Sequence, residues 1–285
     1  MKSNSKILLF LFCGIFIISF AGILVRLVTV NPLVTAFYRV FISSVLLAPI
    51  FIIKFRKQYF HFFDYRFILV GFFLAVHFFL WIAAFEFTSV ANAVVFVAIQ
   101  PVFTVLLEYF WAREDFRRAV IPGIILAVLG SLVISSGDIN ILFTRLWGNL
   151  LALGAAFFAA LYLFSGRNLR RRIEYFPYIF IVYTYAALFL GLVVLAAGRP
   201  LGGFSGLNYF YLAALAVGPT LIGHSVVNFS LRRIPTTYVA VALLGEPILT
   251  STMAWILLGE AVMPTTLMGG LLIILGIYQV VINRH

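Results

Sequence analysis

Two short segments inside apolar runs carry polar side chains of the types that bind a small molecule or exchange a proton. Glu246 precedes Pro247, and Gln100 precedes Pro101 at an offset of 146 residues. Because proline lacks a backbone N–H and clashes with the preceding turn, each proline should interrupt a helix and free a carbonyl group. The carboxyl of Glu246 could then contact a ligand or carry a proton. It could equally be a structural group bonded to a neighbouring helix.

A second pair of segments repeats a polar or amphipathic side chain at a spacing of four. His77 and Trp81 form one pair, and His224 and Asn228 form the other. Side chains four apart share a helix face, so each pair predicts a stripe along one wall of a binding cavity. For either histidine alone we favour an interhelical hydrogen bond, worth about 0.6–2 kcal/mol in membranes. For the symmetric set we favour binding, and two further candidates related by 146 residues are Asn92 and Tyr238.

The remaining charged candidates are predicted to be structural. Arg39 could hold a carboxylate, extend its head group outward, or pair with Glu86, and we favour the ion pair with Glu86. The residue at the repeat-related position is Tyr185, so the repeat does not require a charge there. Glu114 and Glu260 are expected to cap the helix that follows each of them or to brace a hairpin.

The elements that must position these residues are membrane helices. The chain is 64% hydrophobic and only 10% charged, against about 25% in soluble proteins. Ten apolar stretches have about the length needed to cross a bilayer as helices, and they are too long for barrel strands. We predict an all-α integral membrane protein with spans at 7–25, 33–53, 67–85, 91–111, 119–135, 147–166, 178–197, 209–231, 236–258 and 265–282. The first is expected to be an uncleaved helix, because it lacks the cleavage site of a signal peptide.

The basic residues predict the orientation of these spans. Of the 20 Lys and Arg residues, 16 fall on the N-terminal side of the membrane, three fall on the other side, and Arg39 lies within a span. Basic residues concentrate in cytoplasmic connections, so both termini are predicted to be cytoplasmic, in the inner membrane. We therefore attribute the net charge of +11 to basic residues that orient the spans during insertion and contact anionic lipid headgroups, and we expect no nucleic-acid partner.

The 146-residue offset predicts two five-helix repeats, covering residues 1–140 and 141–285. Because five is odd, the second repeat must enter the membrane from the opposite side, and the loop charges agree with this inversion. Glycines at a spacing of seven recur on one helix face of both repeats and predict close helix packing: Gly123, Gly130, Gly269 and Gly276. Inverted repeats are typical of proteins that open a central cavity to each side in turn.

Five motifs, in order, resemble the EamA type of drug/metabolite transporter across essentially the whole chain. They are NPLVTAFYRVFISSVLLAP (31–49), TSVANAVVFVAIQPVF (88–103), GRNLRRR (166–172), GHSVVNFSLRRIPTTYVAVALLGEP (223–247) and LLGEAVMPTTLMGGLLIILGI (257–277). The resemblance implies ten helices, cytoplasmic termini and a central cavity. It also implies movement of small polar or amphipathic metabolites, most often outward, without identifying the cargo.

The expected function is secondary transport of an amino acid-like, sugar-like or amphipathic metabolite, with export favoured. A facilitative exchanger or importer stays open, and a membrane-embedded enzyme is a remote alternative. Residues 7–53 contain no Asp or Glu, which disfavours a proton-driven exporter of cations. No cofactor or metal is expected, the single Cys13 can form no intrachain disulfide, and we favour a monomer.

Overall fold

The protein is helical throughout the part of the chain that the structure describes. The computed structural model describes residues 2–112, 118–138, 143–231, 239 and 242–283. The helical elements are α1 (Lys2–Leu27), α2 (Pro32–Ile50), η1 (Phe51–Phe55), η2 (Arg56–Phe63), α3 (Tyr65–Ala84), α4 (Val90–Val97), α5 (Gln100–Ala112), η3 (Arg118–Val120), α6 (Ile121–Asp138), α7 (Phe143–Arg172), α8 (Tyr175–Ala196), α9 (Gly206–Leu215), η5 (Ala216–Gly223), α10 (His224–Leu231), α12 (Gly245–Leu258) and α13 (Pro264–Asn283).

Eight helices among the described residues are long and apolar enough to cross a membrane. A ninth, shorter apolar helix covers Arg118–Ile134 and coincides with the predicted span 119–135. The predicted span 236–258 is described continuously only from Ala242, and α12 forms its second part. An all-helical membrane protein is therefore confirmed.

Side-chain caps define where several helices begin at the connections. Asn31 accepts a hydrogen bond from the Leu33 amide at 3.0 Å, and Pro32 occupies the first position of α2, where no N–H is needed. The Ser89 hydroxyl accepts from the Asn92 amide at 3.2 Å and starts α4. These caps place the polar ends of the helices outside the apolar spans.

The two predicted proline breaks are present. The span 91–111 divides into α4 and α5, with Pro101 as the second residue of α5. In the second half, α12 begins at Gly245, so that Glu246 and Pro247 lie in its first turn. Proline is tolerated in a first turn, where the backbone N–H has no helical partner, and the helix before it ends instead of continuing.

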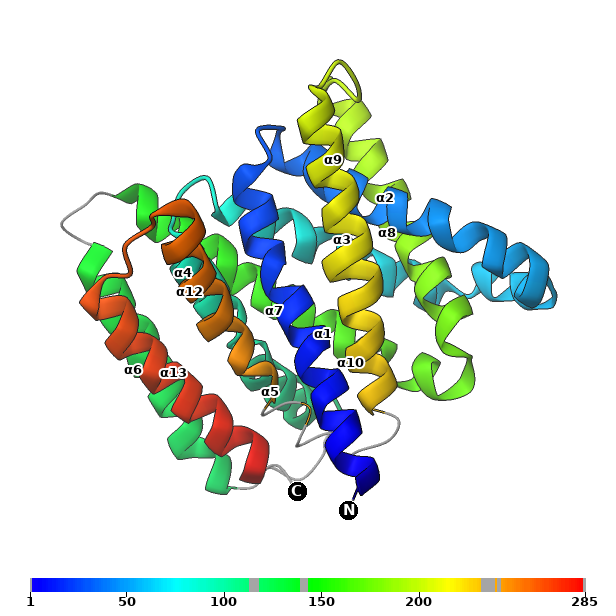
Figure 1. Cartoon of the computed structure of the whole chain (residues 1–285). Coiled ribbons are helices and arrows are strands. Elements are labelled where there is room, and N and C mark those ends of the chain that lie inside the picture. Colours follow the sequence, from blue (N-terminus) through cyan, green and yellow to red (C-terminus); the bar gives the residue numbers. More distant parts are fainter. Residues whose placement is uncertain (1, 113–117, 139–142, 232–238, 240–241, 284–285) are drawn as a thin grey trace.

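The glycines form a close contact between two helices at one edge of the bundle. Helices α6 and α13 lie side by side along one edge (Figure 1). A Cβ atom added to Gly130 would lie 2.5 Å from the Gly269 carbonyl oxygen, and one added to Gly123 would lie 2.5 Å from that of Gly276. The glycines of one helix meet those of the other, which agrees with the predicted packing role.

We expect Gly269→Ala to lower the unfolding temperature, because its Cβ would collide with the backbone of α6 at a cost of about 1–3 kcal/mol. The neighbouring Gly270→Ala is the control, since its Cβ would lie 3.6 Å from the Val95 side chain. Alanine also favours a helix over glycine by about 1 kcal/mol, so the control should be neutral or stabilising. Thermal unfolding in detergent tests the pair, and equal behaviour of the two variants would contradict the packing role.

Candidate functional site

A buried arginine lies at the centre of the candidate site. Arg39, on α2, exposes 2% of its surface. Its Nε donates a hydrogen bond to the Thr220 hydroxyl at 2.8 Å, and its guanidinium carbon lies 4.1 Å from the ring centre of Phe78 and 5.2 Å from that of Trp81. The cation is therefore held between α2, α3 and η5 by one hydrogen bond and two aromatic faces.

A proline in η5 explains why Thr220 can receive this cation. Pro219 has no N–H to donate to Leu215, the residue four positions earlier, and the helix widens here into a π-helical segment. The Thr220 hydroxyl donates to that Leu215 carbonyl at 2.9 Å, which commits its hydrogen. Its oxygen is left as an acceptor, and Arg39 donates to it. The local break of the helix thus fixes the direction of the guanidinium.

Three of the predicted binding residues lie within electrostatic range of Arg39. They are Glu246 on α12, His77 on α3 and His224 on α10, and Tyr183 on α8 interacts with Arg39 in the same way. These residues come from both halves of the sequence. A carboxyl, two imidazoles and a phenol therefore lie within electrostatic range of one buried cation.

The α3 stripe has a defined chemistry. His77 Nδ1 lies 2.8 Å from the Ala155 carbonyl oxygen of α7. Because a carbonyl only accepts, Nδ1 must carry the proton, and in the neutral ring Nε2 is then an acceptor. Trp81 is 5% exposed, and its indole Nε1 is buried without a hydrogen-bond partner. The predicted pair on this stripe thus lies in the site.

Two other predicted binding residues are engaged elsewhere. The Gln100 side-chain amide donates to the Thr104 hydroxyl at 2.6 Å on its own helix. Asn92 is buried and accepts from the Thr266 hydroxyl at 2.7 Å, which ties α4 to α13. Tyr238 and Glu114 lie outside the described residues, as does the side chain of Asn228. The described site therefore consists of Arg39 with His77, Trp81, His224 and Glu246.

One predicted partner is wrong, and of the two roles predicted for Glu260, capping the following helix or bracing a hairpin, the first is wrong. Arg39 does not pair with Glu86, because Arg39 is buried between α2, α3 and η5 while Glu86 is exposed. Glu260 does not cap the helix that follows it. Its carboxylate pairs with Arg26 Nε at 2.7 Å and accepts from the Val90 amide at 2.9 Å, at the start of α4. Glu260 is structural as expected, but it joins the ends of three helices distant in sequence.

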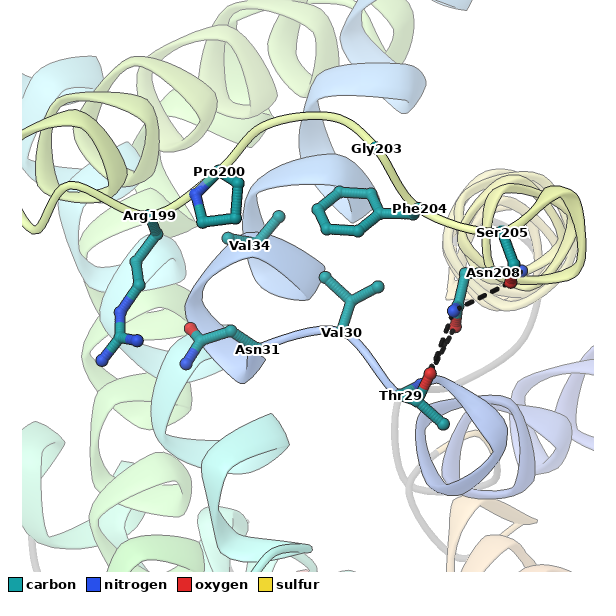
Figure 2. Close-up of a pocket in the computed structure, with 10 residues that line it drawn as sticks. All are labelled: Thr29, Val30, Asn31, Val34, Arg199, Pro200, Gly203, Phe204, Ser205 and Asn208. Carbon is teal, nitrogen blue, oxygen red and sulfur yellow. Dashed lines mark hydrogen bonds between the residues drawn. The ribbon is translucent and has the colours of Figure 1, made fainter.

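Cavities open at the ends of the helices in addition to this site. One of about 380 Å³ lies between the α1–α2 and α8–α9 connections (Figure 2). Across it, Asn208 accepts from the Thr29 amide at 3.0 Å and donates to the Ser205 hydroxyl at 3.1 Å. Another, of about 520 Å³, is bordered by Arg26, Glu86 and Glu260. The two connections that border the first cavity lie at the end of the bundle opposite the start of α1 (Figure 1).

Sequence reasoning missed two residues of the site, Thr220 and Pro219, and a buried carboxylate elsewhere in the bundle, Glu108. Thr220 and Pro219 lie in a span whose proline was a usable signal for a helix irregularity near bound groups. Glu108 is buried and lies 3.5 Å from Arg167, and a carboxylate within an apolar run was itself a signal for an interior partner. Within the described residues, no three His, Cys, Asp or Glu side chains gather closely enough to hold a metal ion.

Helices of membrane length around a buried polar cluster define a multi-pass membrane protein with an interior site. The chain belongs to the EamA-like transporter family, whose model matches residues 5–136 and 146–282. This confirms the resemblance found in the sequence. The family and the names of the relatives indicate a transporter instead of an enzyme.

Curated relatives and a solved structure agree with this assignment. An uncharacterized transporter of Archaeoglobus fulgidus is 30% identical over 67% of this chain and 68% of its own length. The uncharacterized transporter YxxF of Bacillus subtilis is 26% identical over 62% of this chain and 57% of its own length. A crystal structure of a protein that is 17% identical matches 98% of both chains with a TM-score of 0.67, which shows the fold alone.

The contacts of Glu260 predict an order of stability among its variants. Glu260→Gln keeps an acceptor for the Val90 amide and loses the partly exposed ion pair, at a cost of at most about 1 kcal/mol. Glu260→Ala also loses the cap, which adds about 1–2 kcal/mol. Thermal unfolding in detergent should rank wild type, Gln and Ala in that order, with Glu86→Gln unchanged. Equal losses for Gln and Ala would contradict the capping contact.

Proposed function

We propose that the protein is a secondary transporter that moves a small polar or amphipathic metabolite across the cytoplasmic membrane by alternating access, with export as the favoured direction. The observation that carries the proposal is the polar cluster around Arg39, to which α2 and α3 contribute from the first half and η5, α10 and α12 from the second. A site between two halves can be exposed to either side when the halves rearrange.

Ten helices in two inverted repeats, over residues 1–140 and 141–285, are part of this proposal. Support comes from the family model, which matches the two halves separately, and from the paired glycines of α6 and α13. The start of α1 and the end of α13 lie at the same end of the bundle (Figure 1), which agrees with two cytoplasmic termini. The Arg26–Glu260 pair would close the opposite end in this conformation.

Transport itself is tested with purified protein in sealed vesicles. The panel is labelled phenylalanine, glucose and 3-phenylpropionate, which represent amino acid-like, sugar-like and amphipathic cargo. We expect at least one of them to cross faster than in vesicles without protein. A concentration dependence that saturates would separate a transporter from a leak. Movement of all three at the rate of empty vesicles would contradict the proposed function.

Glu246→Gln is expected to flatten the pH dependence of transport between about pH 5 and pH 8, because an amide cannot exchange a proton there. Glu246, His77 and His224 each interact electrostatically with Arg39, so His77→Gln and His224→Gln are measured in parallel. The matched control is Glu174→Gln, since Glu174 is exposed at the start of α8. A pH profile unchanged in Glu246→Gln would reject its proton-coupling role and leave the fold unaffected.

A further inference from the structure

We propose that Arg39 and Trp81 together form a subsite for the carboxylate group of the transported molecule, an assignment that rests on the transport function proposed above. Among the described residues, three buried side-chain polar atoms have no hydrogen-bond partner. Two of them, Arg39 NH1 and Trp81 Nε1, belong to side chains in contact, with the guanidinium carbon 5.2 Å from the Trp81 ring centre. Unpaired buried donors are rare, so two on adjacent side chains indicate an absent acceptor.

The chemistry of the two donors selects the ligand. A guanidinium and an indole N–H can only donate, so their complement is an acceptor, and the positive charge of Arg39 favours an anion. A carboxylate is planar and offers two oxygens, one for each donor. The hydrogen bond from Arg39 Nε to Thr220 and the stacking on Phe78 hold the rest of the guanidinium in place. NH1 is therefore left for the ligand.

The side chains around Arg39 and Trp81 indicate what the rest of the ligand would be. Phe78 and Trp81 are aromatic side chains at the subsite, which suits a ligand with an apolar body. Glu246 is near enough to interact with Arg39, yet the salt bridges of the described residues do not include a bridge between the two. An amino group on the ligand could occupy the acidic side. A ligand with only a carboxylate would need no partner on that side. Both kinds of ligand share the carboxylate group that the subsite would bind.

Calorimetric titration of the purified full-length protein with matched probes tests the subsite. The probes are 3-phenylpropionate, phenylalanine and the neutral amide 3-phenylpropionamide. We expect both carboxylates to bind at least about tenfold more tightly than the amide, which corresponds to one charged hydrogen bond. A preference for phenylalanine that is lost in Glu246→Gln would identify the amino acid as the ligand, and its absence would identify the simple carboxylate.

The decisive variant is Trp81→Phe, which keeps an aromatic face under Arg39 and removes the N–H. It should weaken both carboxylates about tenfold and leave the amide unchanged. Trp147→Phe is the control, because Trp147 is 61% exposed. Arg39→Lys keeps the charge but loses the planar fork, and it should weaken the carboxylates by more than Trp81→Phe does. Because Trp81→Phe leaves the Arg39–Thr220 bond intact, the test does not depend on whether Arg39 variants fold.

The proposal is overturned if the amide binds as tightly as the carboxylates, if Trp81→Phe leaves carboxylate affinity unchanged, or if no probe binds at millimolar concentration. The outcome is separable from that of the transport assay. Carboxylate binding without movement of any panel member would reject transport and retain the subsite. Saturable transport with no discrimination between carboxylate and amide would retain transport and reject the subsite.

Discussion

A cation that cannot reach water is the constraint on which the interior of this protein depends. Burying an unpaired charge is so costly that an arginine persists inside a membrane bundle only where other groups take the place of water. Around Arg39 this place is taken by the Thr220 oxygen and by the faces of Phe78 and Trp81. The helix that supplies Thr220 must be irregular at Pro219 for the hydroxyl to be oriented by the Leu215 carbonyl. One charge thus links α2, α3 and η5.

The two halves share a pattern of helix breaks but differ in chemistry. Gln100 and Glu246 both lie in the first turn of a helix that begins just before a proline. Gln100 bonds to Thr104 one turn later, whereas Glu246 lies in the field of Arg39. Arg39 itself has a tyrosine, Tyr185, at the repeat-related position. The charges that could bind a ligand therefore do not follow from the 146-residue repeat in the sequence.

Local signals in the sequence predicted most of the fold and only part of the site. Apolar length located the spans, the prolines located the breaks, and glycines at a spacing of seven located helix faces that pack closely, without indicating that α6 and α13 pack against each other. The failures concern partners that are distant in sequence. Arg39 meets Thr220 181 positions away, and Glu260 meets Val90 170 positions away. The repeat offset relates equivalent residues, but it does not indicate which helices touch. The predicted partners therefore came from nearby helix ends: Glu86 for Arg39, and the following helix for Glu260.

The contacts differ in how easily they could be exchanged during the alternating access that we propose. The α6–α13 interface is backbone against backbone through four glycines, and close packing of this kind admits few alternative arrangements. Arg26 and Glu260 expose 39% and 19% of their side chains, so their pair contributes at most about 1 kcal/mol. The Asn208–Thr29 bonds at the same end are exposed as well. If the halves rearrange, these polar ties are the contacts that water can replace at little cost, whereas the paired glycines, which join α6 of the first half to α13 of the second, form the contact that is hardest to exchange.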